Sequence, residues 1–105
     1  MANAHRGEIE ATLSGRSYTL CLTLGALAEL EHAYGGEDLL AIAQRFEAGR
    51  ITATDAIRVI AAGLRGAGHA MSDAEVAALT VEGGAAGYVA IMVRLLRATF
   101  GGAEK

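Results

Sequence analysis

Apolar and polar residues alternate along the first quarter of the chain. In residues 8–13 (EIEATL) and again in residues 17–24 (SYTLCLTL), apolar side chains occupy every second position. This period of two is typical of a half-buried β-strand. The connection Ser14-Gly15-Arg16 contains a glycine and is short enough for a hairpin turn. We therefore predict a β-hairpin over about residues 7–24, with these side chains on its apolar face: Ile9, Ala11, Leu13, Tyr18, Leu20, Leu22 and Leu24.

Beyond the hairpin, apolar residues recur every three or four positions, which is the spacing of helices. Glycines divide this part of the chain into five segments, because glycine commonly ends a helix. The predicted helices start near residue 25 and end at Gly35-Gly36, cover about residues 37–48, follow residue 52, cover about residues 72–79, and cover about residues 85–100. The fold class is therefore α+β. We predict a two-stranded hairpin packed on about five helices.

Two of these helices have recognisable starts. Thr52 and Ser72 are good N-cap residues, and an acidic residue follows three positions later in each case, at Asp55 and Glu75. In the helix after Thr52, the predicted core stripe opposes a polar face that includes Asp55. The stripe comprises Ala53, Ile57, Ile60, Ala61 and Leu64.

The last helix carries two apolar stripes instead of one. Ala90, Arg94 and Arg97 alone mark a solvated direction. So wide an apolar arc predicts either a helix central to the core or a helix partly covered by another subunit. The first stripe comprises Tyr88, Ile91, Met92 and Leu95, and the second comprises Val89, Val93, Leu96 and Phe100.

Length and composition fit one folded domain spanning residues 1–105, with the helical part over about residues 25–100 and short flexible ends. Of the 105 residues, 52% are hydrophobic and 20% charged, which is far from the composition of disordered chains. We expect no membrane span and no signal peptide, because glycines and charges interrupt every apolar run. The net charge of −3 argues against nucleic acid. The single Cys21 suits a reducing cytoplasm.

Chemistry of a catalytic kind is sparse in this sequence. Glu8 and Glu10 fit a solvated strand face, and Cys21 lies on a strand with nothing nearby to lower its pKa. His5, His32 and His69 share no metal-ligand spacing, and there is no CxxC. We therefore expect no enzyme, no cofactor and no metal.

The third and fourth helices could form a helix-turn-helix of a small regulator. The fourth helix, however, carries Asp73 and Glu75 and no basic residue through Leu79. DNA would repel a recognition helix of that charge.

The chain resembles a known family over roughly residues 5–100. The resemblance is carried by residues 22–31 (LTLGALAELE), by residues 62–69 (AGLRGAGH) and by residues 72–76 (SDAEV). It is to the gene transfer agent family of small tail proteins, whose members are regarded as phage tail-assembly chaperones. These segments are family signatures and have no catalytic meaning.

The resemblance implies a cytoplasmic protein of the bacterial host that helps to build a long-tailed, phage-like particle. Its expected client is the tape measure protein, with the tail tube protein as a further partner and self-association of the chain. The alternative is a structural tail tube or connector component. Because tube subunits are largely β-sheet and little of this chain is predicted to be strand, the sequence favours the chaperone role. The predicted contact residues lie on the last helix: Val89, Val93, Arg94, Leu96, Arg97 and Phe100.

Overall fold

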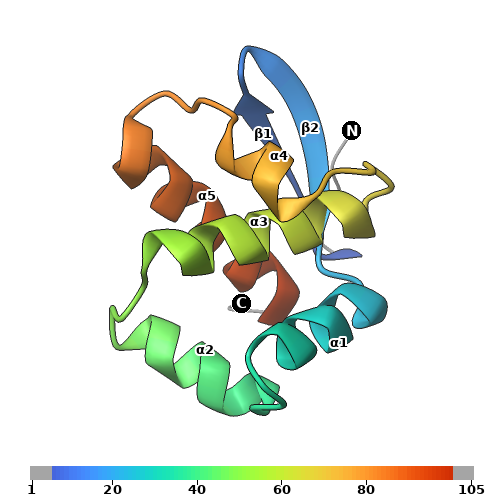
Figure 1. Cartoon of the computed structure of the whole chain (residues 1–105), viewed down its shortest axis with the longest axis vertical. Coiled ribbons are helices and arrows are strands. Elements are labelled where there is room, and N and C mark those ends of the chain that lie inside the picture. The colour runs from blue at the N-terminus through green and yellow to red at the C-terminus, as the bar shows by residue number, and fades with distance from the viewer. Residues whose placement is uncertain (1–5, 101–105) are drawn as a thin grey trace.

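The computed structural model describes residues 6–100 and shows the predicted α+β arrangement of a hairpin and five helices. The hairpin lies at one end of the molecule, α3 crosses the middle, α5 runs behind it, and α1 and α2 lie at the other end (Figure 1). The prediction of short flexible ends falls mainly on residues 1–5 and 101–105, outside the described part. That the chain forms one domain stays a prediction. The elements are β1 (Glu8–Leu13), β2 (Arg16–Cys21), α1 (Leu24–Ala33), α2 (Leu39–Glu47), α3 (Ala53–Gly66), α4 (Asp73–Ala77) and α5 (Gly84–Phe100).

The hairpin is confirmed with a two-residue turn. β1 and β2 pair antiparallel with Glu8 opposite Cys21 at one end, and with Leu13 opposite Arg16 at the other. Ser14 and Gly15 both have positive φ, +51° and +79°, as a type I′ turn requires. The backbone N–H of Ser14 also donates to the carbonyl of Thr80, 2.7 Å away, which ties the turn to the loop after α4.

The second strand is shorter than the alternating pattern predicts. It ends at Cys21, and Thr23 is the N-cap of α1, its hydroxyl accepting a hydrogen bond from the N–H of Ala26 at 3.1 Å. Leu24 is therefore the first residue of a helix and not part of the apolar strand face. Its side chain is 83% exposed. The alternating pattern continues to Leu24, but the strand does not, because the Thr23 cap starts a helix at this point.

Capping also sets the starts of the other helices. Thr52 and Ser72 both form the predicted capping boxes, with Asp55 and Glu75 as their third residues. The second helix begins at Leu39, two residues later than predicted, because Asp38 is its N-cap and its carboxylate accepts from the N–H of Ala41. The fourth ends at Ala77, slightly short of the predicted Leu79.

Helix α3 is the centre of the fold. It packs against β2, α1, α4 and α5, and its side chains from Val59 to Leu64 are buried without a break. The predicted polar face of this helix was wrong at Asp55, which is only 4% exposed. Ala53, predicted in the core stripe, is exposed.

Two glycines let α3 approach its neighbours closely. A Cβ built on Gly63 would lie 2.6 Å from a methyl carbon of Leu95 on α5, and one on Gly66 would lie 2.0 Å from the backbone carbonyl oxygen of Cys21 on β2. Both distances are far below van der Waals contact. These positions therefore set how near the hairpin and α5 come to the central helix.

Candidate functional site

Helix α5 divides its two apolar stripes between the core and the surface. In the first stripe Ile91, Met92 and Leu95 are buried. The second stripe is only half covered, and its last member, Phe100, is 48% exposed. The first stripe therefore completes the core, and the second is the part of α5 that remains available to a partner.

Helix α2 forms the opposite wall of a groove along this second stripe. Ile42 and Phe46 face inward and are buried, whereas Leu40 is 69% exposed. The groove measures about 730 Å³. A smaller apolar pocket of about 10 Å³ lies beside it and shares five of its lining residues. The groove is lined by Leu39, Leu40, Ala43, Phe46, Glu47, Ile51, Val93, Leu96, Arg97 and Phe100.

This lining is apolar except for two rim charges, Glu47 on the α2 wall and Arg97 on the α5 wall. Within residues 6–100 neither charge has a hydrogen bond or an ion pair. A concave apolar surface with polar groups only at its edge suits contact with another protein better than it suits chemistry on a small molecule.

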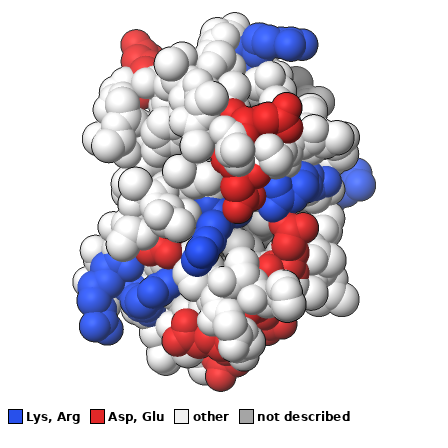
Figure 2. Space-filling model, viewed as in Figure 1, with Lys and Arg blue, Asp and Glu red and all other residues white. Residues whose placement is uncertain are grey.

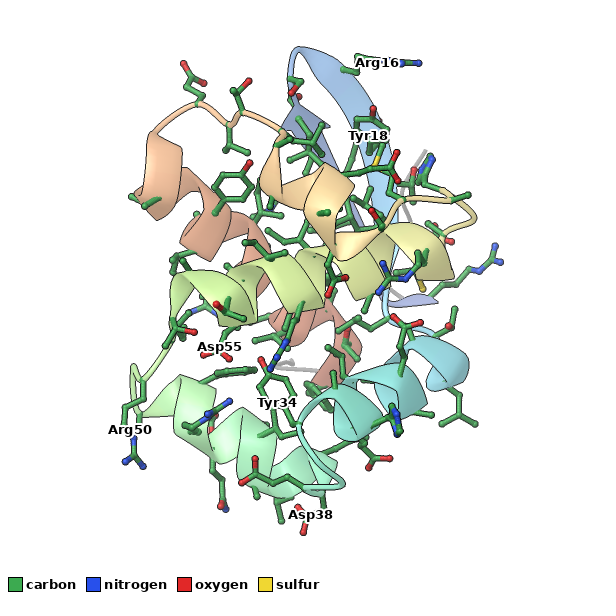
Figure 3. All side chains as sticks on the ribbon, in the orientation of Figure 1. Arg16, Tyr18, Tyr34, Asp38, Arg50 and Asp55 are labelled. Atoms are coloured by element: carbon green, nitrogen blue, oxygen red, sulfur yellow. The ribbon has the colours of Figure 1, made fainter. Side chains whose placement is uncertain are left out.

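The position of α2 depends on a small, partly buried cluster around Asp55. Within the described chain, the backbone of α2 does not approach any other helix or strand as closely as α3 approaches its neighbours. Side chains therefore bridge the distance between α2 and the rest of the fold. The Tyr34 hydroxyl, at the end of α1, donates to the Asp55 carboxylate at 2.5 Å, and the two side chains point toward each other in Figure 3. The Arg45 guanidinium of α2 lies 3.4 Å from the same carboxylate. Asp55 thereby joins three helices at one point.

Two arginines surround the aromatic part of this cluster. The Arg45 guanidinium lies 5.1 Å from the centroid of the Tyr34 ring and 5.2 Å from that of Phe46. The Arg58 guanidinium lies 5.0 Å from the Tyr34 ring. Both are within the range of a cation–π attraction. The Arg45 charge also favours the ionised form of Asp55.

Asp55 is held in its charged form despite its burial. Burial alone would raise its pKa, but hydrogen bonds from Tyr34 and Thr52, together with the Arg45 charge, outweigh burial and lower the pKa below its usual value. A group whose pKa is lower in the folded state stabilises the protein above its unfolded pKa, and the stabilisation disappears as pH falls through the folded pKa.

We therefore expect acid to weaken the attachment of α2. The difference in unfolding free energy between the wild-type protein and an Asp55→Ala variant should be constant above about pH 5 and shrink below about pH 4, near the unfolded pKa of an aspartate. Urea titrations at a series of pH values measure it. A difference that is independent of pH down to pH 2 would contradict the role given to the carboxylate.

The Tyr34 hydroxyl should lose its proton at a higher pH than an ordinary tyrosine. Burial, and next the hydrogen bond to Asp55, raise its pKa to about 12. Ultraviolet absorbance of the tyrosinate, recorded for the wild type and for Tyr34→Phe, isolates this group by difference. We expect the difference spectrum to develop near pH 12, and a midpoint at pH 10 would show that Tyr34 is solvated instead. Because the folded pKa is raised, the stabilisation it brings is present below pH 10 and is lost as pH approaches 12.

The predicted contact residues fall in different surroundings. Val93, Leu96, Arg97 and Phe100 line the groove, whereas Val89 lies outside it. Arg94 donates to the carbonyl of Glu10 at 2.7 Å and so anchors α5 to the hairpin. That these six residues bind a partner stays a prediction.

The α2 wall of the groove was not predicted. Leu40 of α2 and Ile51, in the segment after that helix, contribute to it. Two adjacent leucines, Leu39 and Leu40, at the start of a helix were the available signal, because adjacent positions on a helix cannot both face the core. It became interpretable only once α2 was placed opposite α5.

Among the titratable residues weighed for catalysis, Cys21 and His69 make local contacts. Burial raises the pKa of the Cys21 thiol, and Glu8 acts in the same direction, so the thiolate that a nucleophile needs is disfavoured. His69 packs edge-on against Tyr18, with ring centroids 5.1 Å apart, and His32 is exposed. His5 lies outside the described residues. No group of three metal-ligating side chains occurs within residues 6–100.

On the face shown in Figure 2, acidic and basic side chains are interspersed. Arg65, for example, pairs with Glu29 and, at 3.2 Å, with Asp73. Within the described part of the chain, no helix combines the length and apolarity needed to cross a membrane.

The chain matches a protein family over residues 6–102. The family is described as phage tail tube protein, GTA-gp10. The chain belongs to this family. Comparison with curated proteins and with solved structures returned no match.

This membership corrects the expected function. The family is one of tail tube proteins, which contradicts the assembly-chaperone role with the tape measure protein as client and favours the structural alternative. The low strand content used against a tube subunit is real, since β1 and β2 have six residues each. The inference from strand content to a chaperone role was wrong, because a fold class does not determine what a protein does.

Proposed function

We propose that this protein is a structural component of the tail of a phage-like particle, contributing to its tail tube through contacts with copies of itself and with other tail proteins. The family match over residues 6–102 carries this proposal. Assembly in the cytoplasm of the bacterial host, before the particle is released, follows from the same proposal. The role is one of binding and shape, with no catalytic step.

The surface between α2 and α5 supports the proposal. A subunit that is buried in an assembly needs an apolar area that its own fold leaves uncovered, and monomeric proteins rarely keep such areas large. Here the uncovered area joins the second stripe of α5 to α2 and includes the exposed Leu40 and Phe100. We assign the predicted contact residues Val93, Leu96, Arg97 and Phe100 to this surface.

Quantitative mass spectrometry of purified particles tests the role. We expect the protein to be retained in many copies, in a fixed ratio to the other tail proteins. If it is absent from finished particles while their tails are complete, the structural role is wrong.

Complementation with variants then tests the surface. Phe100→Asp should prevent incorporation into particles, and Ala90→Asp, at an exposed position of the same helix outside the groove, should not. Circular dichroism and thermal unfolding of both purified variants establish that each remains folded. Equal incorporation of both variants would exclude the groove as an assembly surface.

A further inference from the structure

Two apolar features remain uncovered on the described surface, and they lie on different helices. One is the groove between α2 and α5, and the other is the outer side of the first turn of α1, where Leu24 is 83% exposed. We propose that the first turn of α1 of one copy docks into the groove of the next copy. This deepens the structural role proposed above, on which it rests, by naming the occupant of the groove and the direction of the contact.

The apolar ridge on α1 is rigidly presented. The Thr23 cap holds the first turn, and the inward side of the helix is made by Ala26 and Leu30, which are buried. Ala28 follows Leu24 by one turn and is also exposed, so the two share the outer side of α1. A capped helix start can enter a partner with little loss of conformational freedom.

The groove has the character of a site for apolar side chains on a helix. Its volume of about 730 Å³ far exceeds one leucine side chain and leaves room for a helical turn. Eight of its ten lining residues are apolar, and the two charged residues lie on opposite walls. Without polar groups converging on its floor, the groove lacks what orients a small ligand.

The charges beside the two features are complementary. Glu31 lies two turns after Leu24 on nearly the same side of α1, and within residues 6–100 its carboxylate has no hydrogen bond or ion pair. Arg97 on the α5 wall is equally unpaired, whereas Glu29 is already paired with Arg65. Docking with Glu31 toward Arg97 keeps it away from Glu47 on the other wall. The rim charges therefore select one orientation of the ridge in the groove.

This contact joins different surfaces of identical chains. A ridge and a groove that do not overlap form a heterologous interface, which leaves a free groove at one end of every pair and a free ridge at the other. Such a contact continues from copy to copy and closes only where its rotation closes a ring. Rings and helical stacks are the two arrangements that build a tube.

Complementary variants of the full chain test this directly. Leu24→Asp removes the ridge and leaves the groove, and Leu40→Asp damages the groove and leaves the ridge. Both residues are strongly exposed, so both variants should fold as the wild type does, which circular dichroism checks. Ala90→Asp serves as the matched control, because it places the same charge on an exposed site outside both features.

In sedimentation velocity at increasing concentration, we expect the wild type and Ala90→Asp to form oligomers beyond the dimer. Leu24→Asp and Leu40→Asp should each raise the dissociation constant at least about tenfold, the loss typical of an interface anchor residue. An equimolar mixture of the two should form a dimer and nothing larger, since only one productive interface remains. Arg97→Glu should also weaken association, and combining it with Glu31→Arg in the same chain should restore it.

The outcomes that overturn the proposal are distinct. If the wild type stays monomeric at every concentration, or if Leu24→Asp associates as the wild type does, the ridge does not dock. If Leu40→Asp alone prevents association and the mixture stays unpaired, the groove meets the groove of a second copy about a two-fold axis. Many copies in purified particles together with a monomeric wild type would remove the docking model and keep the tail role. If the protein forms head-to-tail oligomers but is missing from particles, the docking model stands and the tail role is wrong.

Discussion

Gly66→Ala is expected to destabilise the protein by about 3 kcal/mol or more, the upper range for overpacking in a core. A Cβ at this position would lie 2.0 Å from the carbonyl oxygen of Cys21 and 3.3 Å from its carbonyl carbon. These are backbone atoms, so no side-chain rotation can relieve the clash. The end of α3 and the end of β2 would have to separate, and the packing of the hairpin on the central helix would be lost with them.

The matched control for this change is Gly25→Ala. It is also a glycine in a helix, but a Cβ there would meet only the Thr23 hydroxyl, at 3.9 Å. Replacing an unconstrained helical glycine by alanine stabilises by roughly 0.5–1 kcal/mol. Urea unfolding of the two variants should therefore give shifts of opposite sign. A Gly66→Ala protein as stable as the wild type would show that α3 and β2 are less closely packed than described.

The second large effect is expected at Asp55, where Asp55→Ala should cost about 2–4 kcal/mol. The variant loses the capping box of α3, and it leaves the Tyr34 hydroxyl and the Arg45 guanidinium without their shared acceptor. Hydrogen bonds to a charged group contribute more than those between neutral groups, and the half-buried Tyr34 hydroxyl would lose its acceptor. The attachment of α2 to α3 should loosen at the same time.

Glu75→Ala provides the comparison, since Glu75 has the same place in the exposed capping box of α4. There we expect a loss of only about 0.5–1 kcal/mol, as for an ordinary capping interaction. Thermal and urea unfolding of both variants measure the difference. Equal losses would mean that the contacts of Asp55 with Tyr34 and Arg45 add nothing to the cap.

Local signals in the sequence predicted much of the fold, and long-range contacts account for what was missed. The hairpin turn and the caps at Thr52 and Ser72 involve residues at most a few positions apart, so their patterns identify them. The burial of Asp55 depends on Tyr34, which is 21 residues away, and no periodicity contains that pairing. The helix pattern placed Asp55 on a polar face for this reason.

The candidate site shows the same division. Two apolar stripes on α5 were evident, but the choice of which one faces the core was made by the packing of Leu95 against Gly63 of α3. The exposed Leu40 can be assigned to a binding surface only because it lines the same groove as Phe100. The family signature identified tail proteins, whereas the strand content pointed to the wrong role among them.

The position of α5 also determines when the chain can fold during synthesis. The hairpin is the first element made, yet β1 packs against α5, the last, and α3 packs against both β2 and α5. Before segments so far apart in sequence can form favourable contacts, a long loop must close, and that closure costs conformational entropy. Until α5 has left the ribosome, the buried faces of the hairpin and of α3 lack their cover. The nascent chain therefore exposes its core for most of its synthesis, a period in which early contact with neighbouring chains is a hazard.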